Sequence, residues 1–144
     1  MLVKFIKAAE TYPLRLKVLR PGGVEEDCHF ANDRLEGAFH LGVHLGEERI
    51  SVASFYPEKQ PTLNGWKQYR LRGMATDPEH QGKGAGKRLM VFAIEHIKAQ
   101  RADMLWCNAR VIAIPFYEKI GFEIKGDQFE IPGIGPHFLM TLKC

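Results

Sequence analysis

The sequence lacks the features of a secreted, metal-binding or membrane protein. Its three cysteines, Cys28, Cys107 and Cys144, form no C-x-x-C pair, and no histidine stands beside them at zinc-ligand spacing. An odd number of such cysteines favours reduced thiols inside a cell over a disulfide framework. No apolar run approaches the length that crosses a bilayer, and the first residues have no long apolar core. We therefore expect a cytoplasmic protein with no metal site and no membrane contact.

Charge of either sign is not in large excess. The 144 residues carry 20 Lys and Arg against 17 Asp and Glu, a net charge of +3. That balance is too mild to indicate a nucleic-acid partner. With 45% hydrophobic and 26% charged residues and no internal repeat, the composition predicts one ordinary globular domain spanning residues 1–144.

A glycine-rich stretch precedes a strongly helical run. Gly82, Gly84 and Gly86 alternate with small or basic residues just before Lys87 and Arg88. Glycine removes the side chains that would hold a ligand away from the backbone, and a helix N-terminus offers free N–H groups and partial positive charge. The stretch therefore predicts a loop that binds phosphate.

Two common phosphate-binding motifs do not fit this loop. A Walker motif would need glycine at Gln81 and Ser or Thr at Arg88, and a dinucleotide motif would need glycine at Lys87. The remaining pattern, Gln81-x-x-Gly84-x-Gly86, resembles the pyrophosphate-binding Q/R-x-x-G-x-G/A motif of the GNAT superfamily of N-acetyltransferases.

The apolar pattern predicts an α+β fold with helices packed against a mixed sheet. Strands are expected at Leu2–Lys7, Ala38–Leu45, Ile50–Tyr56, Lys67–Thr76, Ala102–Asn108, Phe122–Lys125 and Phe138–Lys143, and helices from Lys87 to about Arg101 and at Arg110–Ile120. The segment Thr11–Arg20 fits a strand or a helix, and its Thr-x-Pro entry favours a helix. Gly46–Glu48 predicts a hairpin, Gly73 a bulge, and Glu25–Glu36 an irregular connection.

A second motif resembles the same family. Asn108–Phe122 is similar to the family's N-x-x-x-x-A-x-x-F-Y-x-x-x-G-F run, and it follows the glycine motif in the family's order. Glu10–Arg15 and Pro136–His137 resemble small bacterial members, so the resemblance covers nearly the whole chain. It implies the GNAT fold, a mixed and mostly antiparallel sheet flanked by helices, with a V-shaped splay between two central parallel strands.

The resemblance implies acetyl-CoA as the cofactor. The backbone of residues 74–76 would bond the pantetheine arm as a neighbouring strand would, and the glycine loop would hold the pyrophosphate. The cofactor-binding residues implied are Met74, Ala75, Thr76, Gln81, Gly82, Lys83, Gly84, Ala85, Gly86, Lys87, Asn108, Phe116 and Tyr117.

The resemblance also implies Tyr117, Asn108 and His137 as catalytic residues. Attack of an amine on a thioester develops negative charge on oxygen and then on sulfur, so an oxyanion donor and a proton donor are needed. Tyr117 is expected to protonate the departing thiolate, and the Ala75 N–H to serve as the oxyanion donor. The general base stays open between His137, His44 and water.

We therefore expect an N-acetyltransferase that acts by direct attack on a small primary amine or an exposed amino group, and the family is compatible with a homodimer. Cys107 is expected to be a small core residue and not a nucleophile. Acceptor specificity is assigned to the loops Pro21–Asn32, Pro57–Trp66 and Ile131–His137. The alternatives are an inactive CoA-binding sensor and, more remotely, a nucleotide-binding domain.

Overall fold

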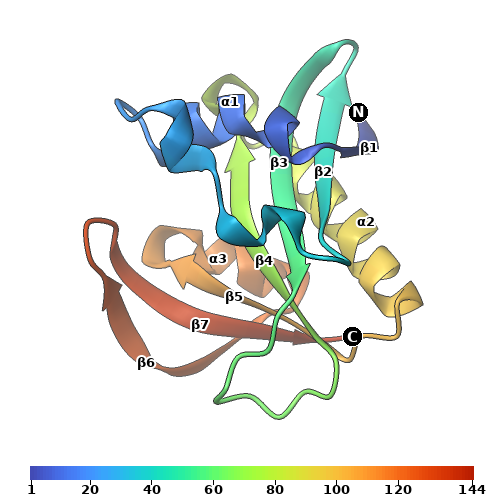
Figure 1. Ribbon diagram of the computed structural model, residues 1–144, viewed down its shortest axis with the longest axis vertical. Coiled ribbons are helices and arrows are strands. Elements are labelled where there is room, and N and C mark those ends of the chain that lie inside the picture. The colour runs from blue at the N-terminus through green and yellow to red at the C-terminus, as the bar shows by residue number, and fades with distance from the viewer.

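The computed structural model describes residues 1–144 and contains one seven-stranded sheet (Figure 1). The strands are β1 (Leu2–Ile6), β2 (Phe39–Leu45), β3 (Glu48–Pro57), β4 (Gln68–Thr76), β5 (Met104–Arg110), β6 (Glu123–Ile131) and β7 (Gly135–Lys143). Their order across the sheet is β1-β2-β3-β4-β5-β7-β6. All neighbours are antiparallel except β4 and β5, which confirms the predicted mixed sheet.

The helices are short except for one. They are α1 (Tyr12–Leu14), α2 (Ala85–Ala99) and α3 (Ile114–Ile120), with 3-10 turns at Ala8–Thr11, Glu25–Cys28, Ala31–Arg34, Pro78–His80 and Val111–Ala113. A π-helical turn, Arg15–Leu19, continues α1, so the predicted helix over Thr11–Arg20 is confirmed. None of the helices is long and apolar enough to cross a membrane.

Helices cover both faces of the sheet. Leu41 of β2 packs in the same core as Leu89 of α2. On the opposite face, Val52 of β3 and Ala75 of β4 pack against Leu14 of α1. Figure 1 shows the N-terminal segments in front of the strands and α2 behind them. Helix α2 and the N-terminal helix α1 therefore lie on opposite faces of the sheet.

The central strands separate after a short contact. β4 and β5 pair only at Gln68–Met104, Tyr69–Leu105 and Arg70–Trp106. Beyond these pairs β4 continues to Thr76 beside β3, and β5 continues to Arg110 beside β7. The two strands diverge in Figure 1, as the resemblance implies. This splay leaves backbone groups on one edge of β4 without a neighbouring strand.

The predicted bulge is present in β4. The register with β3 shifts so that Gly73 and Met74 lie opposite Ala53. Gly73 has φ +68°, a left-handed conformation that favours glycine. A Cβ atom there would lie 3.1 Å from Arg15 Nε and from the Phe30 ring, so the bulge also allows close approach of the N-terminal segments.

Several predicted boundaries differ from the structure: the strand expected at Ala102–Asn108 is Met104–Arg110, and the helix expected at Arg110–Ile120 begins at Ile114 after a 3-10 turn. The last two strands form a hairpin longer than Phe122–Lys125 and Phe138–Lys143, because β6 is an exposed edge strand whose polar residues give no apolar pattern. Helix α2 begins two residues before Lys87, since Gly84 caps it with φ +86°. Glu25–Glu36 is not irregular throughout but holds two 3-10 turns.

Candidate active site

Two pockets meet at the splay. The larger, with a volume of about 630 Å³, is lined by the glycine loop, the start of α2 and one side of α3, and we call it the glycine pocket. The smaller, of about 320 Å³, lies between β4 and β5 against the N-terminal segments and the β6–β7 turn, and we call it the splay pocket. Met74 and Ala113 line both pockets, so a ligand could extend from one into the other.

The glycine pocket is suited to phosphate. The first backbone bond of α2 runs from the Arg88 N–H to the Gly84 carbonyl at 3.0 Å. The N–H groups of Ala85, Gly86 and Lys87 therefore have no helical acceptor, and all three residues line the pocket. Their free N–H groups and the helix dipole attract an anion to this position.

The structure divides the expected cofactor residues between the pockets. Those lining the glycine pocket are Met74, Thr76, Gln81, Gly82, Gly84, Ala85, Gly86, Lys87 and Phe116. Asn108 and Tyr117 line the splay pocket, whereas Ala75 and Lys83 line neither. The sequence reasoning missed Val18, His80, Ile112, Ala113, Lys119 and Ile120 in the glycine pocket. Lys119 and Ile120 follow Phe116 by three and four residues on α3, so helical spacing offered a signal for them.

The ladder geometry decides which backbone groups face the splay. The Asp77 N–H donates to the Ile50 carbonyl of β3 at 2.8 Å. Along an antiparallel strand, successive backbone N–H groups point alternately to the two neighbouring positions in the sheet. The Ala75 N–H therefore points to β3, as that of Asp77 does, and the Thr76 N–H points to the side from which β5 has diverged. The Gln81 side chain reaches the Thr76 carbonyl at 3.3 Å from that open side. Thr76, and not Ala75, thus presents its polar backbone to a ligand.

Tyr117 lies at the wall of the splay pocket with its ring in the core. The ring packs against Phe116 and Phe122 with centroids 5.1 and 5.3 Å away. Burial raises the pKa of the Tyr117 phenol well above its ordinary value of 10, so the hydroxyl keeps its proton at neutral pH. Burial likewise raises the pKa of the Cys107 thiol to about 12, which leaves it protonated and a poor nucleophile.

The two histidines considered as bases lie in different places. His137 lines the splay pocket, and its Nδ1 lies 2.8 Å from the Gly135 carbonyl. A carbonyl only accepts, so Nδ1 carries the hydrogen and Nε2 keeps a free lone pair. His44 lines neither pocket and its Nε2 accepts a hydrogen bond from Arg49 at 3.2 Å. The structure therefore brings His137, and not His44, beside Tyr117 and Asn108.

Comparison with known proteins decides the family. The acetyltransferase (GNAT) domain family matches residues 30–144. The uncharacterized N-acetyltransferase YitI of Bacillus subtilis is 41% identical over 138 residues, covering 96% of this chain and 93% of that protein. The chain belongs to the GNAT acetyltransferase family. It is accordingly an acyl-CoA-dependent acyltransferase.

Solved structures agree in fold with this family member. The ribosomal-protein-S18-alanine N-acetyltransferase of Escherichia coli has a TM-score of 0.78 at 18% identity, over 99% of this chain and 92% of that one. An aminoglycoside 6'-N-acetyltransferase complexed with coenzyme A has a TM-score of 0.72 at 13% identity, over 99% and 97%. These likenesses confirm the GNAT fold predicted from the sequence motifs.

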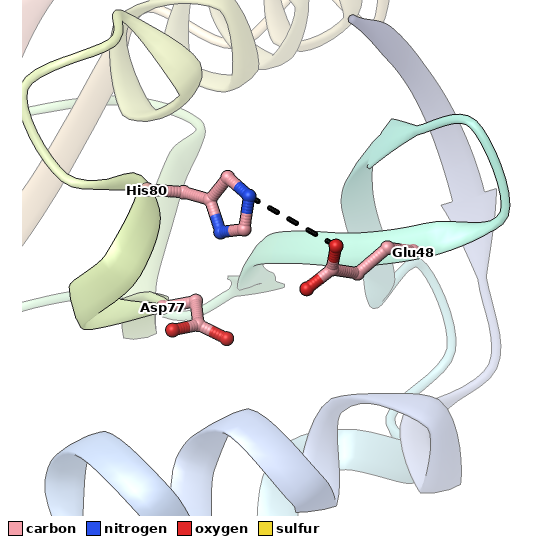
Figure 2. A group of neighbouring side chains, drawn as sticks. All are labelled: Glu48, Asp77 and His80. Atoms are coloured by element: carbon pink, nitrogen blue, oxygen red, sulfur yellow. Dashed lines mark ion pairs between the residues drawn. The ribbon is translucent and has the colours of Figure 1, made fainter.

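One cluster beside the GNAT glycine loop was not predicted. Figure 2 shows Glu48, Asp77 and His80 facing one another, with potential ligand atoms within 4.8 Å. His80 Nε2 lies 3.9 Å from Glu48, and the Lys17 ammonium lies 3.2 Å from Asp77. These contacts tie the β2–β3 hairpin and the N-terminal helices to the start of the glycine loop. Residue spacing gave no signal because the three side chains come from two separate segments.

We expect Gly86→Val to weaken CoA binding while the fold persists. A Cβ at Gly86 would lie 3.1 Å from the Phe116 ring and 3.2 Å from Met74 Cε, so the branched side chain must project into the glycine pocket. Overpacking of this kind costs roughly 1–3 kcal/mol, or about 5- to 150-fold in affinity. Calorimetric titration with CoA measures the loss. Glu95→Val, on the exposed face of α2, is the control. If Gly86→Val bound CoA with unchanged affinity, the glycine loop would only connect β4 to α2 and would not bind phosphate.

Proposed function

We propose that the protein transfers the acetyl group of acetyl-CoA to a primary amine by direct attack in a ternary complex. The observation that carries this proposal is the junction at Met74 and Ala113. There the pocket at the N-terminus of α2, which is suited to phosphate, opens into a pocket lined by Tyr117 and His137. One pocket is suited to the anionic end of the cofactor, and the other supplies groups that can exchange protons.

The residues present fit acetyl-CoA. Gly82 and Gly84 have open space where a Cβ would stand, so phosphate oxygens can reach the backbone N–H groups of the loop. The Thr76 backbone faces the splay and can bond the pantetheine arm in place of the missing strand. Phe116 packs along the same pocket. Bound in this way, acetyl-CoA would supply the activated acetyl group.

Tyr117 and His137 complete the proton balance. As the amine nitrogen bonds to the acetyl carbon and the carbon–sulfur bond breaks, the Tyr117 hydroxyl donates a proton to sulfur. The nitrogen gives up a proton to His137 Nε2 or to water. Asn108 lies in the same pocket and can donate a hydrogen bond to the acyl or pantetheine group. The Ala75 N–H is not assigned as oxyanion donor, because it points to β3.

The names of the structural neighbours support an amine as acceptor. One acts on the alanine of a ribosomal protein and another on an aminoglycoside, so the fold serves amines of different size. We assign this chain an amine acceptor of small-molecule size, since the splay pocket measures about 320 Å³.

Acetyl-CoA is expected to raise the melting temperature. At about 100 times its dissociation constant a ligand that binds only the folded state adds roughly 2.7 kcal/mol, which for a domain of this size corresponds to about 5–10 °C. Scanning fluorimetry with acetyl-CoA up to millimolar concentration measures the shift. A flat melting temperature would refute the proposal, and stabilisation by ATP but not by CoA would indicate a nucleotide-binding domain. Stabilisation by CoA with no thiol released from any amine would indicate a sensor.

A further inference from the structure

The splay pocket is lined by positive charge without negative charge. Its lining includes Arg20, Arg70, Arg72 and Arg110, and no aspartate or glutamate. All four arginines are half-buried. A guanidinium group stays charged at neutral pH, so the pocket holds four cations.

Only one of the four arginines has an acidic partner. Arg70 lies 3.1 Å from Glu58. Arg20 donates only to the carbonyl of its neighbour Leu19, at 2.9 Å. The side chains of Arg72 and Arg110 make no hydrogen bond and no ion pair with the protein. Three guanidinium groups at this pocket are therefore available to a ligand.

Arg72 is held in place despite having no counter-charge. Its guanidinium carbon lies 4.0 Å from the centroid of the Phe30 ring, and Arg15 stacks on the same ring at 3.9 Å. Arg15 is neutralised by Asp33, but Arg72 is not. Burial, and after it the nearby charge of Arg70, lower the pKa of Arg72. An aromatic ring thus positions an uncompensated cation at the pocket wall, which is how proteins orient a planar guanidinium toward an anion.

We propose that the acceptor is an amine whose molecule also carries a carboxylate or phosphate group, and that Arg72, with Arg20 and Arg110, binds that group. This inference rests on the proposed function and names its substrate class. Carboxylate and phosphate are the anions that an arginine fork binds through two parallel hydrogen bonds. An anion beside three guanidinium groups would also remove their mutual repulsion.

The same charges favour the reactive form of the acceptor. A cation near an amine disfavours the ammonium form, so the arginines lower the pKa of the bound amine and increase the neutral fraction that can attack. They also repel acceptors that carry several ammonium groups and no anion. The acidic residues Glu25, Glu26 and Asp27, which could have attracted a cationic acceptor, line neither pocket.

The test compares acceptors that differ only in the anionic group. Amino acids are paired with their amides, and amino-sugar phosphates with the parent amino sugars, with spermidine as the polycation. Thiol release from acetyl-CoA gives kcat/KM for each. We expect the anionic member of at least one pair to be preferred by roughly 10- to 150-fold, and spermidine to be a poor acceptor. The two kinds of pair distinguish carboxylate from phosphate.

The Arg72→Met variant tests whether Arg72 causes the preference for anionic acceptors. Arg72→Met keeps an unbranched side chain against Phe30 and removes the charge, so the preference should fall by about tenfold or more. The change should appear in the KM of the anionic acceptor, with the KM of acetyl-CoA unchanged, because the contact is remote from the reacting atoms. Arg34→Met is the control, since Arg34 is exposed, makes no ion pair and lines neither pocket.

The outcomes separate this inference from the proposed function. Equal or better turnover of the neutral or cationic acceptors would overturn the anion site and leave acetyl transfer standing. If no amine is acetylated, calorimetry with the N-acetylated member of each pair in the presence of CoA still decides the matter. Preferential binding of the anionic form, lost in Arg72→Met, supports the site, and equal binding of both forms overturns it.

Discussion

Tyr117→Phe is expected to lower turnover by roughly 10²- to 10⁴-fold, which is the usual loss when a general acid is removed. Phenylalanine keeps the ring that packs between Phe116 and Phe122, so the core and the fold should persist. Tyr117 lines the splay pocket and burial raises the pKa of its hydroxyl, which is therefore a neutral phenol able to donate its proton. Thiol release with a known acceptor gives the rate, and calorimetry gives the CoA affinity of the same preparation.

The two measurements distinguish three roles of the hydroxyl. Loss of rate with unchanged CoA affinity is the result that a proton donor requires. Loss of both would show that the hydroxyl positions the cofactor. A folded variant that binds CoA and turns over at the parent rate would show that Tyr117 is only part of the core, and that sulfur receives its proton from water or another group.

The sequence could place the glycine loop residues in one pocket because they are contiguous in the chain, and their binding of acetyl-CoA stays a prediction. Gln81, Gly84 and Gly86 lie close together in the sequence, so their spacing alone is enough to predict a loop that binds phosphate. The bulge at Gly73 was also predicted, since only glycine readily takes its left-handed conformation. Features that depend on a few neighbouring residues, such as this loop and this bulge, can therefore be predicted from the sequence.

The arginine cluster of the splay pocket was not predicted, because its members come from separate segments of the chain. Arg20 follows the N-terminal helices, Arg70 and Arg72 lie on β4, and Arg110 ends β5. A net charge of +3 gives no sign of the cluster, since distant acids elsewhere in the chain offset it. Of the three loops to which specificity was assigned, Pro57–Trp66 contributes nothing to the pocket lining.

A second feature beyond sequence reasoning is a buried ion pair beneath the splay pocket. Arg15 is fully buried and lies 2.7 Å from Asp33, and its guanidinium also donates to the Ser54 hydroxyl at 2.6 Å. The Tyr56 hydroxyl donates to the same carboxylate. Arg15 in turn supports the Phe30 ring that lines the pocket. The pair thus connects the stability of the fold to the shape of the acceptor site.

Asp33→Asn is expected to destabilise the fold strongly, because it leaves the Arg15 charge buried without a counter-charge. Breaking a buried pair in this way costs roughly 3–5 kcal/mol, which corresponds to a melting temperature lower by about 6–20 °C. Asp27→Asn is a matched control. Each carboxylate accepts the N–H of the residue three positions before it and closes a 3-10 turn, but Asp27 is exposed and makes no ion pair. A change of no more than about 0.5 kcal/mol is expected there.

The pH dependence gives an independent check on this pair. Burial by itself would raise the pKa of the Asp33 carboxyl, but hydrogen bonds from Arg15 and Tyr56 and the Arg15 charge outweigh it and lower the pKa. A carboxyl whose pKa is lower in the folded state stabilises the fold above its unfolded pKa of about 4, and that stability is lost as the pH falls through the folded value. The melting temperature of the parent protein should therefore fall steeply below about pH 4. The Asp33→Asn variant lacks this carboxyl, so its melting temperature should be lower at neutral pH and should fall less steeply as the pH is lowered. If the melting temperatures of the two proteins fell in parallel with pH, this role of the pair would be contradicted.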